Sequence, residues 1–222
     1  MGSCSPFGNA KTAPIWIIGH DPRLRNSMAE AETCFFFDLN TEPAGTRART
    51  SERALAQAVW AYVSMLVGRQ VALDELYITN LCNYFLPPPP KNAVVLIPQV
   101  QADNGLRELT SALASRLAPP RLIIAMSQQV LFHFVRTKFI APSSGLDEFL
   151  HNSAPSPRIA QAGGYRARKN AAFLSVCGKV FQHDGVPVVP VLHISSAQRK
   201  PPRYRESMIL AGKNIQELIK DA

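Results

Sequence analysis

Short apolar runs alternate along this chain with longer segments in which apolar residues recur every three or four positions. Short runs bounded by turn residues are typical of buried strands, and the longer periodic segments are typical of amphipathic helices. Strands are therefore expected at 15–19, 76–79, 121–126 and 187–192. Helices are expected from Thr50 or Ser51 to a stop at Gly68, from a cap at Asp103 to Pro119, from Ser127 to Val135, and from about Tyr204 to Ile219.

The segments between these elements contain turn and loop residues. Residues 141–170 are rich in Pro, Ser, Gly and Arg, which predicts a long loop. Four consecutive prolines at 87–90 predict a second irregular segment, because proline cannot donate a backbone hydrogen bond. The sequence His183-Asp184-Gly185 predicts a tight turn or hairpin. Residues 1–13 are expected to form a loose N-terminal segment.

Alternating strands and helices predict an α/β fold, with a mostly parallel central sheet and helices on both faces. We expect a single three-layer α/β/α domain over residues 1–222, since the length favours one domain. Such folds bind ligands at the carboxyl ends of their strands. Polar, chemically capable groups follow every expected strand, which indicates a site: His20 and Asp21, then Asn80, then Ser127 and Gln128, and finally His193 and Ser195.

The composition places the chain among globular proteins and adds a strong positive charge. Hydrophobic residues make up 46% of the 222 residues, enough for a sizeable core. No apolar run approaches a membrane span, and the first residues lack the layout of a secretory signal, so a cytoplasmic location without membrane contact is expected. The formal net charge is +8, concentrated in short Arg/Lys clusters beside turn residues. Such clusters suit DNA phosphates, but solubility alone would also explain them.

Several familiar sites are missing from the sequence. It contains no GxGxxG, GxxxxGK[ST], GxSxG or HExxH motif, so the main dehydrogenase, NTPase, hydrolase and zincin signatures are absent. The four cysteines are widely spaced without a CxxC pair, which favours buried or idle thiols over a disulfide framework or metal site. No cofactor or metal is expected.

Four segments, in order, resemble the uracil-DNA glycosylase superfamily. IIGHDPR is similar to its first motif, written GQDPYH or GEAPG, and LYITNLCNYFLPPPP is similar to VYITNVVKCRPP of its iron–sulfur branch. PRLIIAMSQQVLFHFV resembles PKLIVALGRVAARAL, and VPVVPVLHISSAQRKPPRYR resembles the closing strand with its HPS or HPA loop. The resemblance implies a monomeric enzyme that removes uracil or a related deaminated base from DNA.

The same resemblance implies roles for individual residues. Asp21 matches the acid that orients water or steadies the sugar cation, and His193 matches the histidine that supports charge growing on the base. Asn80 matches the amide that reads the base edge. An aromatic residue, Phe35 or Phe36 with Phe35 favoured, would stack on the base beside Gly19 and His20. DNA phosphate contacts are expected from Arg23, Ser195, Arg199, Lys200 and Arg203.

The sequence also departs from the family pattern. Arg23 stands where one branch has a tyrosine that excludes thymine, which puts strict selection for uracil in doubt. Ile194 replaces the proline of HPS. Tyr84 stands where the iron–sulfur branch has a cluster cysteine, with Cys82 two residues earlier, so no cluster is expected. These departures indicate a divergent member with an altered substrate.

Two other interpretations remain open from the residues alone. One keeps the fold but makes the chain a DNA- or nucleobase-binding protein with a degenerate site; the presence of both Asp21 and His193 argues against it. The other is an unrelated doubly wound enzyme that acts on a small nucleotide, with the basic loops binding its phosphate. Binding of free uracil separates the glycosylase from this second alternative.

Overall fold

The computed structural model describes residues 4–20, 34, 50–84, 96–153, 170–194 and 202–220, with the backbone alone at 50–54, 202 and 203. The strands are β1 (Ile15–Gly19), β2 (Leu76–Asn80), β3 (Leu122–Met126), β4 (Phe181–His183) and β5 (Val186–Val191). The helices are α1 (Thr50–Val67), the 3₁₀ turn η2 (Leu73–Glu75), α2 (Gln99–Ala114), α3 (Gln128–Arg136), α4 (Ser144–Ser153) and α7 (Pro202–Lys220).

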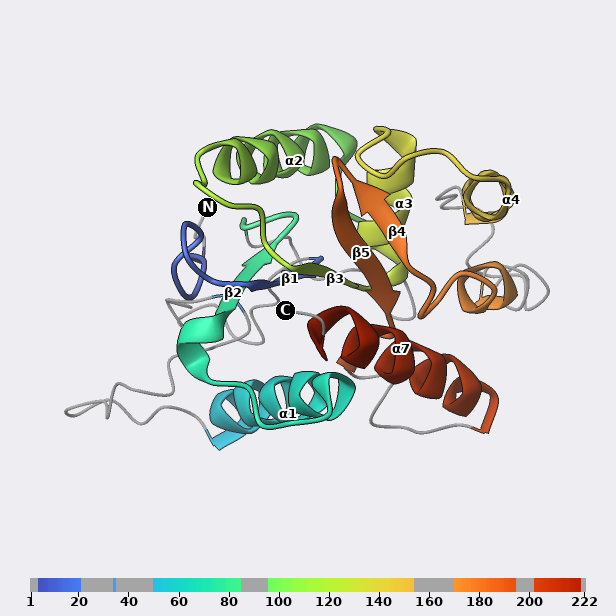
Figure 1. Cartoon of the computed structure of the whole chain (residues 1–222). Coiled ribbons are helices and arrows are strands. Elements are labelled where there is room, and N and C mark those ends of the chain that lie inside the picture. Colours follow the sequence, from blue (N-terminus) through green and yellow to red (C-terminus); the bar gives the residue numbers. More distant parts are fainter. Residues whose placement is uncertain are drawn as a thin grey trace.

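The five strands form one sheet in the order β2-β1-β3-β5-β4 (Figure 1). All neighbours are parallel except β4, which pairs antiparallel with β5. Every residue of β1, β2 and β3 is buried. Strands that are apolar along their whole length need cover on both faces, which explains the continuous apolar runs in the sequence.

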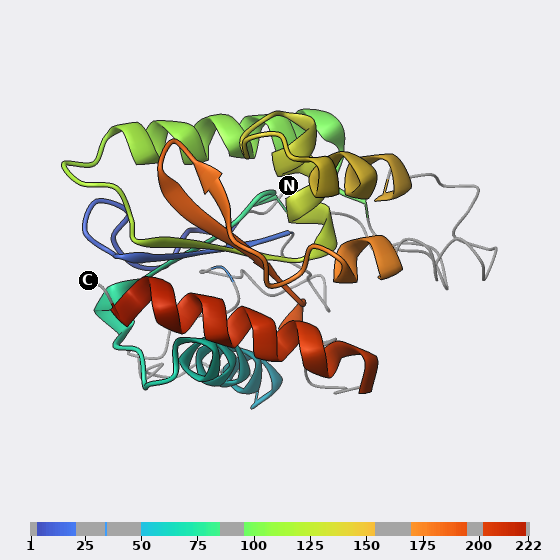
Figure 2. The same cartoon turned by 45° about the vertical axis from the view of Figure 1, so that its right-hand side comes forward.

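Helices supply that cover on both sides of the sheet. Figures 1 and 2 show α2, α3 and α4 on one side and α1 and α7 on the other, which confirms the predicted α/β arrangement. The chain passes from β1 through α1 to β2, and then through α2, on the opposite face, to β3 on the other side of β1. The direction of chain progression therefore reverses between β1 and β3, and the carboxyl ends of two such strands are the usual ligand position in parallel sheets.

Residues 4–13 differ from the expected loose segment. Phe7 forms an antiparallel bridge with Ile78, with both N–H groups donating to the partner's carbonyl oxygen at 2.8 and 2.9 Å. The Cys4 N–H donates to the Asn83 carbonyl oxygen at 2.9 Å. The edge strand β2 thus gains partners on its outer side, because the N-terminal segment satisfies backbone groups that would otherwise be exposed.

Two helices differ from the expectation. The segment 141–170 contains α4, whose apolar side chains Leu146 and Phe149 are buried despite the Ser- and Gly-rich surroundings. Helix α2 begins at Gln99, four residues before the expected cap. Asp103 is therefore inside the helix, where it forms an ion pair with Arg136 of α3 instead of capping. The burial of α4 and the Asp103–Arg136 ion pair both depend on contacts between helices, which a local sequence pattern does not record.

Local signals predicted two other boundaries correctly. The Ser127 hydroxyl accepts a hydrogen bond from the Val130 N–H and caps α3, as serine does at many helix starts. Asp184 and Gly185 both have positive φ, 46° and 83°, and join β4 to β5. Two successive residues with positive φ form the turn whose twist matches a two-residue hairpin.

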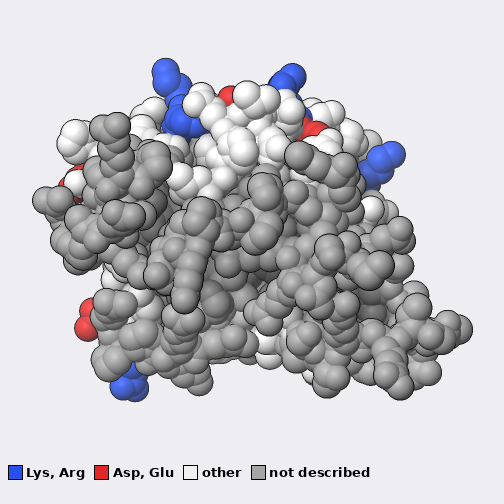
Figure 3. Space-filling model, turned by 180° about the vertical axis from the view of Figure 1, so that it is seen from behind, with Lys and Arg blue, Asp and Glu red and all other residues white. Residues whose placement is uncertain are grey.

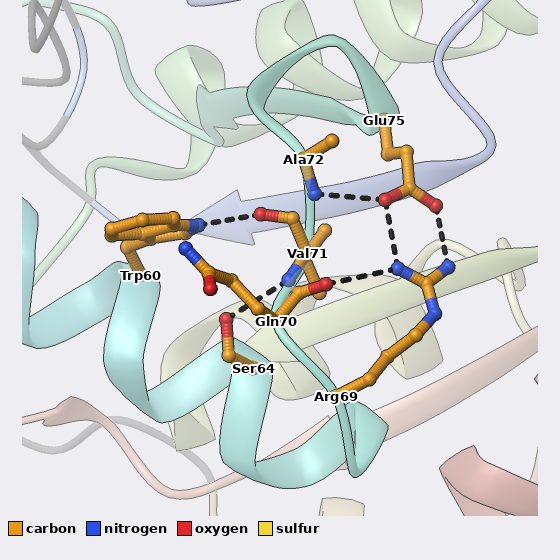
Figure 4. Close-up of polar contacts among 7 residues, drawn as sticks. All are labelled: Trp60, Ser64, Arg69, Gln70, Val71, Ala72 and Glu75. Carbon is orange, nitrogen blue, oxygen red and sulfur yellow. Dashed lines mark hydrogen bonds and ion pairs between the residues drawn. The ribbon is translucent and has the colours of Figure 1, made fainter.

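A compact polar loop joins α1 to β2 (Figure 4). The Glu75 carboxylate accepts two hydrogen bonds from the Arg69 guanidinium, at 2.8 and 2.5 Å, and one from the Ala72 N–H at 2.8 Å. The Trp60 indole N–H donates to the Val71 carbonyl oxygen at 2.7 Å and connects the loop to α1. These contacts hold the entry to β2 in place.

We expect Glu75→Gln to lower the free energy of unfolding at pH 7 by about 1 kcal/mol or less, the usual range for a partly exposed ion pair. The Arg69 guanidinium and the Ala72 N–H lower the pKa of Glu75 below its ordinary value. A carboxylate of lowered pKa stabilises the fold above its unfolded pKa, near 4.3, and the contribution disappears as the pH falls through the folded pKa. Urea unfolding should therefore show the wild-type protein to be more stable than Glu75→Gln at pH 7, and this difference in unfolding free energy should disappear in acid. A difference in unfolding free energy that grows in acid would contradict a stabilising role for the Glu75 carboxylate.

Candidate functional site

The ends of β1 and β2 are joined by hydrogen bonds into a single edge. Gly19 and Asn80 are register partners. Beyond them, the Leu81 N–H donates to the Gly19 carbonyl oxygen at 2.8 Å, and the Cys82 N–H donates to the His20 carbonyl oxygen at 3.1 Å. The two backbone segments thus stay paired past the ends of β1 and β2. This pairing fixes the backbone positions of the candidate residues His20 and Asn80.

Two histidines from distant parts of the chain meet at this edge. The His20 and His193 rings lie with centroids 5.7 Å apart and planes at 69°, an edge-to-face contact. His20 follows β1 and is buried, whereas His193 follows β5 and is partly buried. Because β3 separates these strands, their axes are about 10 Å apart, and the two rings reach toward each other across the end of β3. The two imidazoles thus meet at the ligand position expected from the sheet order.

The Asn80 side chain carries an unused acceptor. It is 4% exposed, and its Nδ2 donates to the Cys4 sulfur at 3.6 Å. Its Oδ1 has no hydrogen-bond partner among the residues that the structure describes. A buried acceptor without a partner costs about 1–3 kcal/mol, so most such groups in folded proteins are bonded. A ligand N–H donor at this position would remove that cost.

The Asn83 side chain fixes the backbone at Asn80 through hydrogen bonds, a role that the sequence pattern did not reveal. Its Oδ1 accepts the Asn80 N–H at 3.2 Å, the Thr79 hydroxyl at 3.5 Å and the Cys34 thiol at 3.3 Å. A side-chain oxygen that accepts a hydrogen bond from the backbone N–H three residues earlier stabilises a turn. In the sequence, only the spacing Asn80-x-x-Asn83 indicated this contact. The turn fixes the direction in which the chain leaves β2.

A glycine allows α2 to lie directly against this turn. A Cβ atom on Gly105 would lie 1.9 Å from the Leu81 carbonyl oxygen and 2.9 Å from its carbon. These distances exclude any side chain at position 105 without movement of the backbone. An isolated glycine within a helical pattern often has such a packing reason, and this signal could have pointed to the contact.

Most of the other predicted site residues lie outside the described residues. Of the predicted set, Gly19, His20, Asn80 and His193 are described, and they lie along one sheet edge. Arg203 is in α7, with only its backbone described. The predictions for the following residues fall outside the described ranges: Asp21, Arg23, Phe35, Phe36, Ser195, Arg199 and Lys200.

The Arg/Lys clusters of the sequence, at residues 23–25, 47–53, 166–169 and 199–205, also lie largely outside the described ranges. Within them, Arg205 alone has a described side chain, and it is exposed. On the face drawn in Figure 3, the described Lys and Arg side chains lie at separate places along the upper edge and at the lower left, with acidic, neutral or undescribed atoms between them. The described residues on that face therefore form no continuous basic patch.

The cysteines divide into a pair and two separate thiols. The sulfurs of Cys4 and Cys34 lie 3.0 Å apart, and all four cysteines are buried, as expected. The Cys82 thiol lies 3.0 Å from Gln101 Oε1, and burial raises the pKa of Cys177 to about 12. Across the described ranges, no three His, Cys, Asp or Glu side chains come together as a metal site.

A bilayer-spanning helix is likewise not found among the described helices. No protein-family model matches this chain, and no curated protein matches its sequence.

Proposed function

We propose that this chain is a DNA glycosylase that hydrolyses the N-glycosidic bond of a flipped-out uracil or related deaminated base. One observation carries the proposal: the buried Asn80 amide, with its unpartnered Oδ1, lies at the same sheet edge as the His20–His193 pair. An amide that offers both a donor and an acceptor can read the edge of a pyrimidine. An imidazole N–H can bind an oxygen of the same base.

The chemistry of the reaction matches these groups. Cleavage leaves positive charge on the sugar and negative charge on the departing base, so a catalyst must stabilise both. In the proposed mechanism, His193 donates an N–H to the base oxygen as charge grows there. Asp21, the residue after His20 and two after the end of β1, orients the attacking water or steadies the sugar cation.

The strand order places Asn80 and His193 on opposite sides of the proposed base position. Asn80 is on β2 and His193 follows β5, three strand spacings or about 14 Å apart measured between strand axes. A base bound between them would lie over the ends of β1 and β3, where His20 and the Ser127 turn approach. DNA must therefore present the base alone, since a stacked base inside a duplex could not reach this position.

The charge of the chain supports a polyanionic partner. A formal net charge of +8 draws DNA by long-range attraction, which weakens as salt screens it. The basic residues around positions 23, 199 and 203 are proposed to contact phosphates. Phosphate contacts position the DNA, while the base itself is read by the pocket.

A panel of labelled oligonucleotides tests the proposal. Each carries one uracil, hypoxanthine, xanthine or mismatched thymine, in single- and double-stranded form, and alkali reveals abasic sites. We expect excision of at least one deaminated base, inhibited by free uracil or by the excised base itself. The ranking also shows how Arg23, in place of the family's tyrosine, affects discrimination against thymine.

The same panel distinguishes the alternatives. Salt-dependent DNA binding with no abasic site on any substrate would contradict the glycosylase and leave a base-binding module. Failure of both DNA binding and free-base binding, together with binding of nucleoside phosphates, would indicate a nucleotide enzyme instead. Undamaged DNA of the same sequence is the control for nonspecific cleavage.

A further inference from the structure

We propose that Cys4 and Cys34 form a reversible intramolecular disulfide. This covalent modification site is joined by a hydrogen bond to Asn80, the residue proposed to read the base. The two sulfurs lie 3.0 Å apart in hydrogen-bond contact, about 1 Å beyond the length of a disulfide bond. The proposed hydrolysis assigns no chemical step to these thiols. Their residues are 30 positions apart, so the fold alone brings them together.

The backbone holds both cysteines in this position. The Cys4 N–H donates to the Asn83 carbonyl oxygen at 2.9 Å, and the Cys34 N–H donates to the Ser5 carbonyl oxygen at 2.8 Å. Residue 34 is thus bonded to the neighbour of residue 4, which keeps the two Cα atoms near one another. A disulfide requires such proximity, and two anchored backbones need only a small side-chain movement to form it.

The surroundings make the two thiols unequal. Hydrogen bonds from Cys34 and then Asn80 lower the pKa of Cys4, against the opposing effect of burial. The same pairing, together with burial, raises the pKa of Cys34. The thiolate is the nucleophilic form of cysteine. The Cys4 sulfur accepts the Asn80 Nδ2 hydrogen bond, while the Cys34 thiol donates to Asn83 Oδ1. These contacts assign Cys4 as the attacking sulfur and Cys34 as the resolving thiol.

A small hollow lies next to residues that contact the two cysteines. A hollow of about 40 Å³ is lined by Thr79, Asn80 and Asn83, three residues that take part in the hydrogen-bond network around the two sulfurs. This volume accommodates about one water molecule, and hydrogen peroxide is only slightly larger. Both sulfurs are buried, and neither lines this hollow. We take hydrogen peroxide as the oxidant, because a small molecule reaches a buried thiol more readily than a bulky disulfide reagent.

The oxidation proceeds in two balanced steps. The Cys4 thiolate attacks one oxygen of hydrogen peroxide, forming a sulfenic acid and releasing hydroxide, which takes up the proton lost by Cys4 to become water. The Cys34 sulfur then attacks the sulfenic sulfur, forms the S–S bond and displaces a second water, which carries the Cys34 proton. One peroxide is reduced to two waters as two thiols are oxidised. A dithiol reductant reverses the change.

Oxidation would also alter Asn80. In the reduced protein, the Cys4 sulfur accepts the Asn80 Nδ2 hydrogen bond, which sets the orientation of the amide. A disulfide sulfur is a weak hydrogen-bond acceptor, and the Cys4 sulfur must move toward Cys34 to form the bond, so the contact that orients the amide is weakened. The consequence for base recognition rests on the proposed function, whereas formation of the disulfide does not.

The test begins with the full-length wild-type protein and hydrogen peroxide, followed by thiol titration and peptide mapping. We expect two of the four thiols to disappear, a mass loss of two hydrogen atoms, and a cross-linked peptide joining Cys4 to Cys34. Dithiothreitol should restore all four thiols. The oxidised protein should melt about 5 °C or more above the reduced one, because the bond closes a loop of about 30 residues.

Two variants provide the comparison. Cys177→Ser should still form the Cys4–Cys34 cross-link, while Cys34→Ser should lose it and accumulate Cys4 sulfenic acid, measured as a mass gain of one oxygen atom on the Cys4 peptide. Absence of the cross-link from oxidised wild-type protein, or a cross-link to Cys82 or Cys177 instead, would overturn the proposal. Mapping on wild-type protein decides the matter even if Cys34→Ser folds poorly.

A separate assay measures the link to Asn80. We expect oxidation to lower kcat/KM for excision of the preferred base by roughly tenfold, a typical coupling between two sites. Equal activity in both forms would remove the regulatory role and leave the disulfide intact. No excision in either form would count against the proposed function alone, since the cross-link is detected without any substrate.

Discussion

His193→Ala is expected to lower the single-turnover rate of base excision at pH 7 by at least about 100-fold. The imidazole N–H is proposed to stabilise negative charge that exists in full only in the transition state, so its removal affects the chemical step more than DNA binding. Asp21→Asn should cause a loss of at least similar size, because the neutral amide neither steadies a cation nor orients water as a carboxylate does.

The comparison requires matched measurements. His151→Ala removes an exposed histidine of α4 and should leave the rate unchanged. Fluorescence anisotropy with undamaged duplex should show all three variants binding DNA within about twofold of the wild-type protein, since none removes a proposed phosphate contact. Wild-type rates in both His193→Ala and Asp21→Asn would show that these residues do not perform the chemistry.

Gly105→Ala should be the most destabilising small substitution near the site. The added methyl group would lie 1.9 Å from the Leu81 carbonyl oxygen, a backbone atom that cannot move away without shifting β2 or α2. Overpacking of this kind costs about 2–3 kcal/mol even after the better helix propensity of alanine is included. We expect the melting temperature to fall by about 5–10 °C, measured by circular dichroism.

Gly212→Ala is the matched control for that substitution. Gly212 is also a glycine inside a helix, but the nearest neighbours of a new Cβ there lie at 3.8 and 3.9 Å, ordinary contact distances. Alanine there should be neutral or stabilising by up to about 1 kcal/mol. Equal melting temperatures for the two variants would show that α2 can shift away from Leu81. The close contact between Gly105 and Leu81 would then not be needed to hold the turn after Asn80.

The candidate site was predictable in part from the order of strands and polar residues. A residue that follows a parallel strand must appear at the carboxyl edge of the sheet, which is why Asn80 and His193 could be named from the sequence. Cys4, Asn83 and Gly105 could not be named in the same way. Their importance depends on contacts between segments far apart in the chain, and each residue type has many other uses.

The sequence by itself determined the elements whose signals are local. Continuous apolar runs specify buried strands such as β1, Ser127 caps α3, and Asp184-Gly185 makes the turn between β4 and β5, because each depends on neighbours a few positions away.

The tertiary structure decided what depends on distant contacts. The strand order, the burial that makes α4 a helix and the meeting of His20 with His193 all require long-range packing. Loops of many residues must close before such contacts form, and local patterns along the chain do not record which segments will meet.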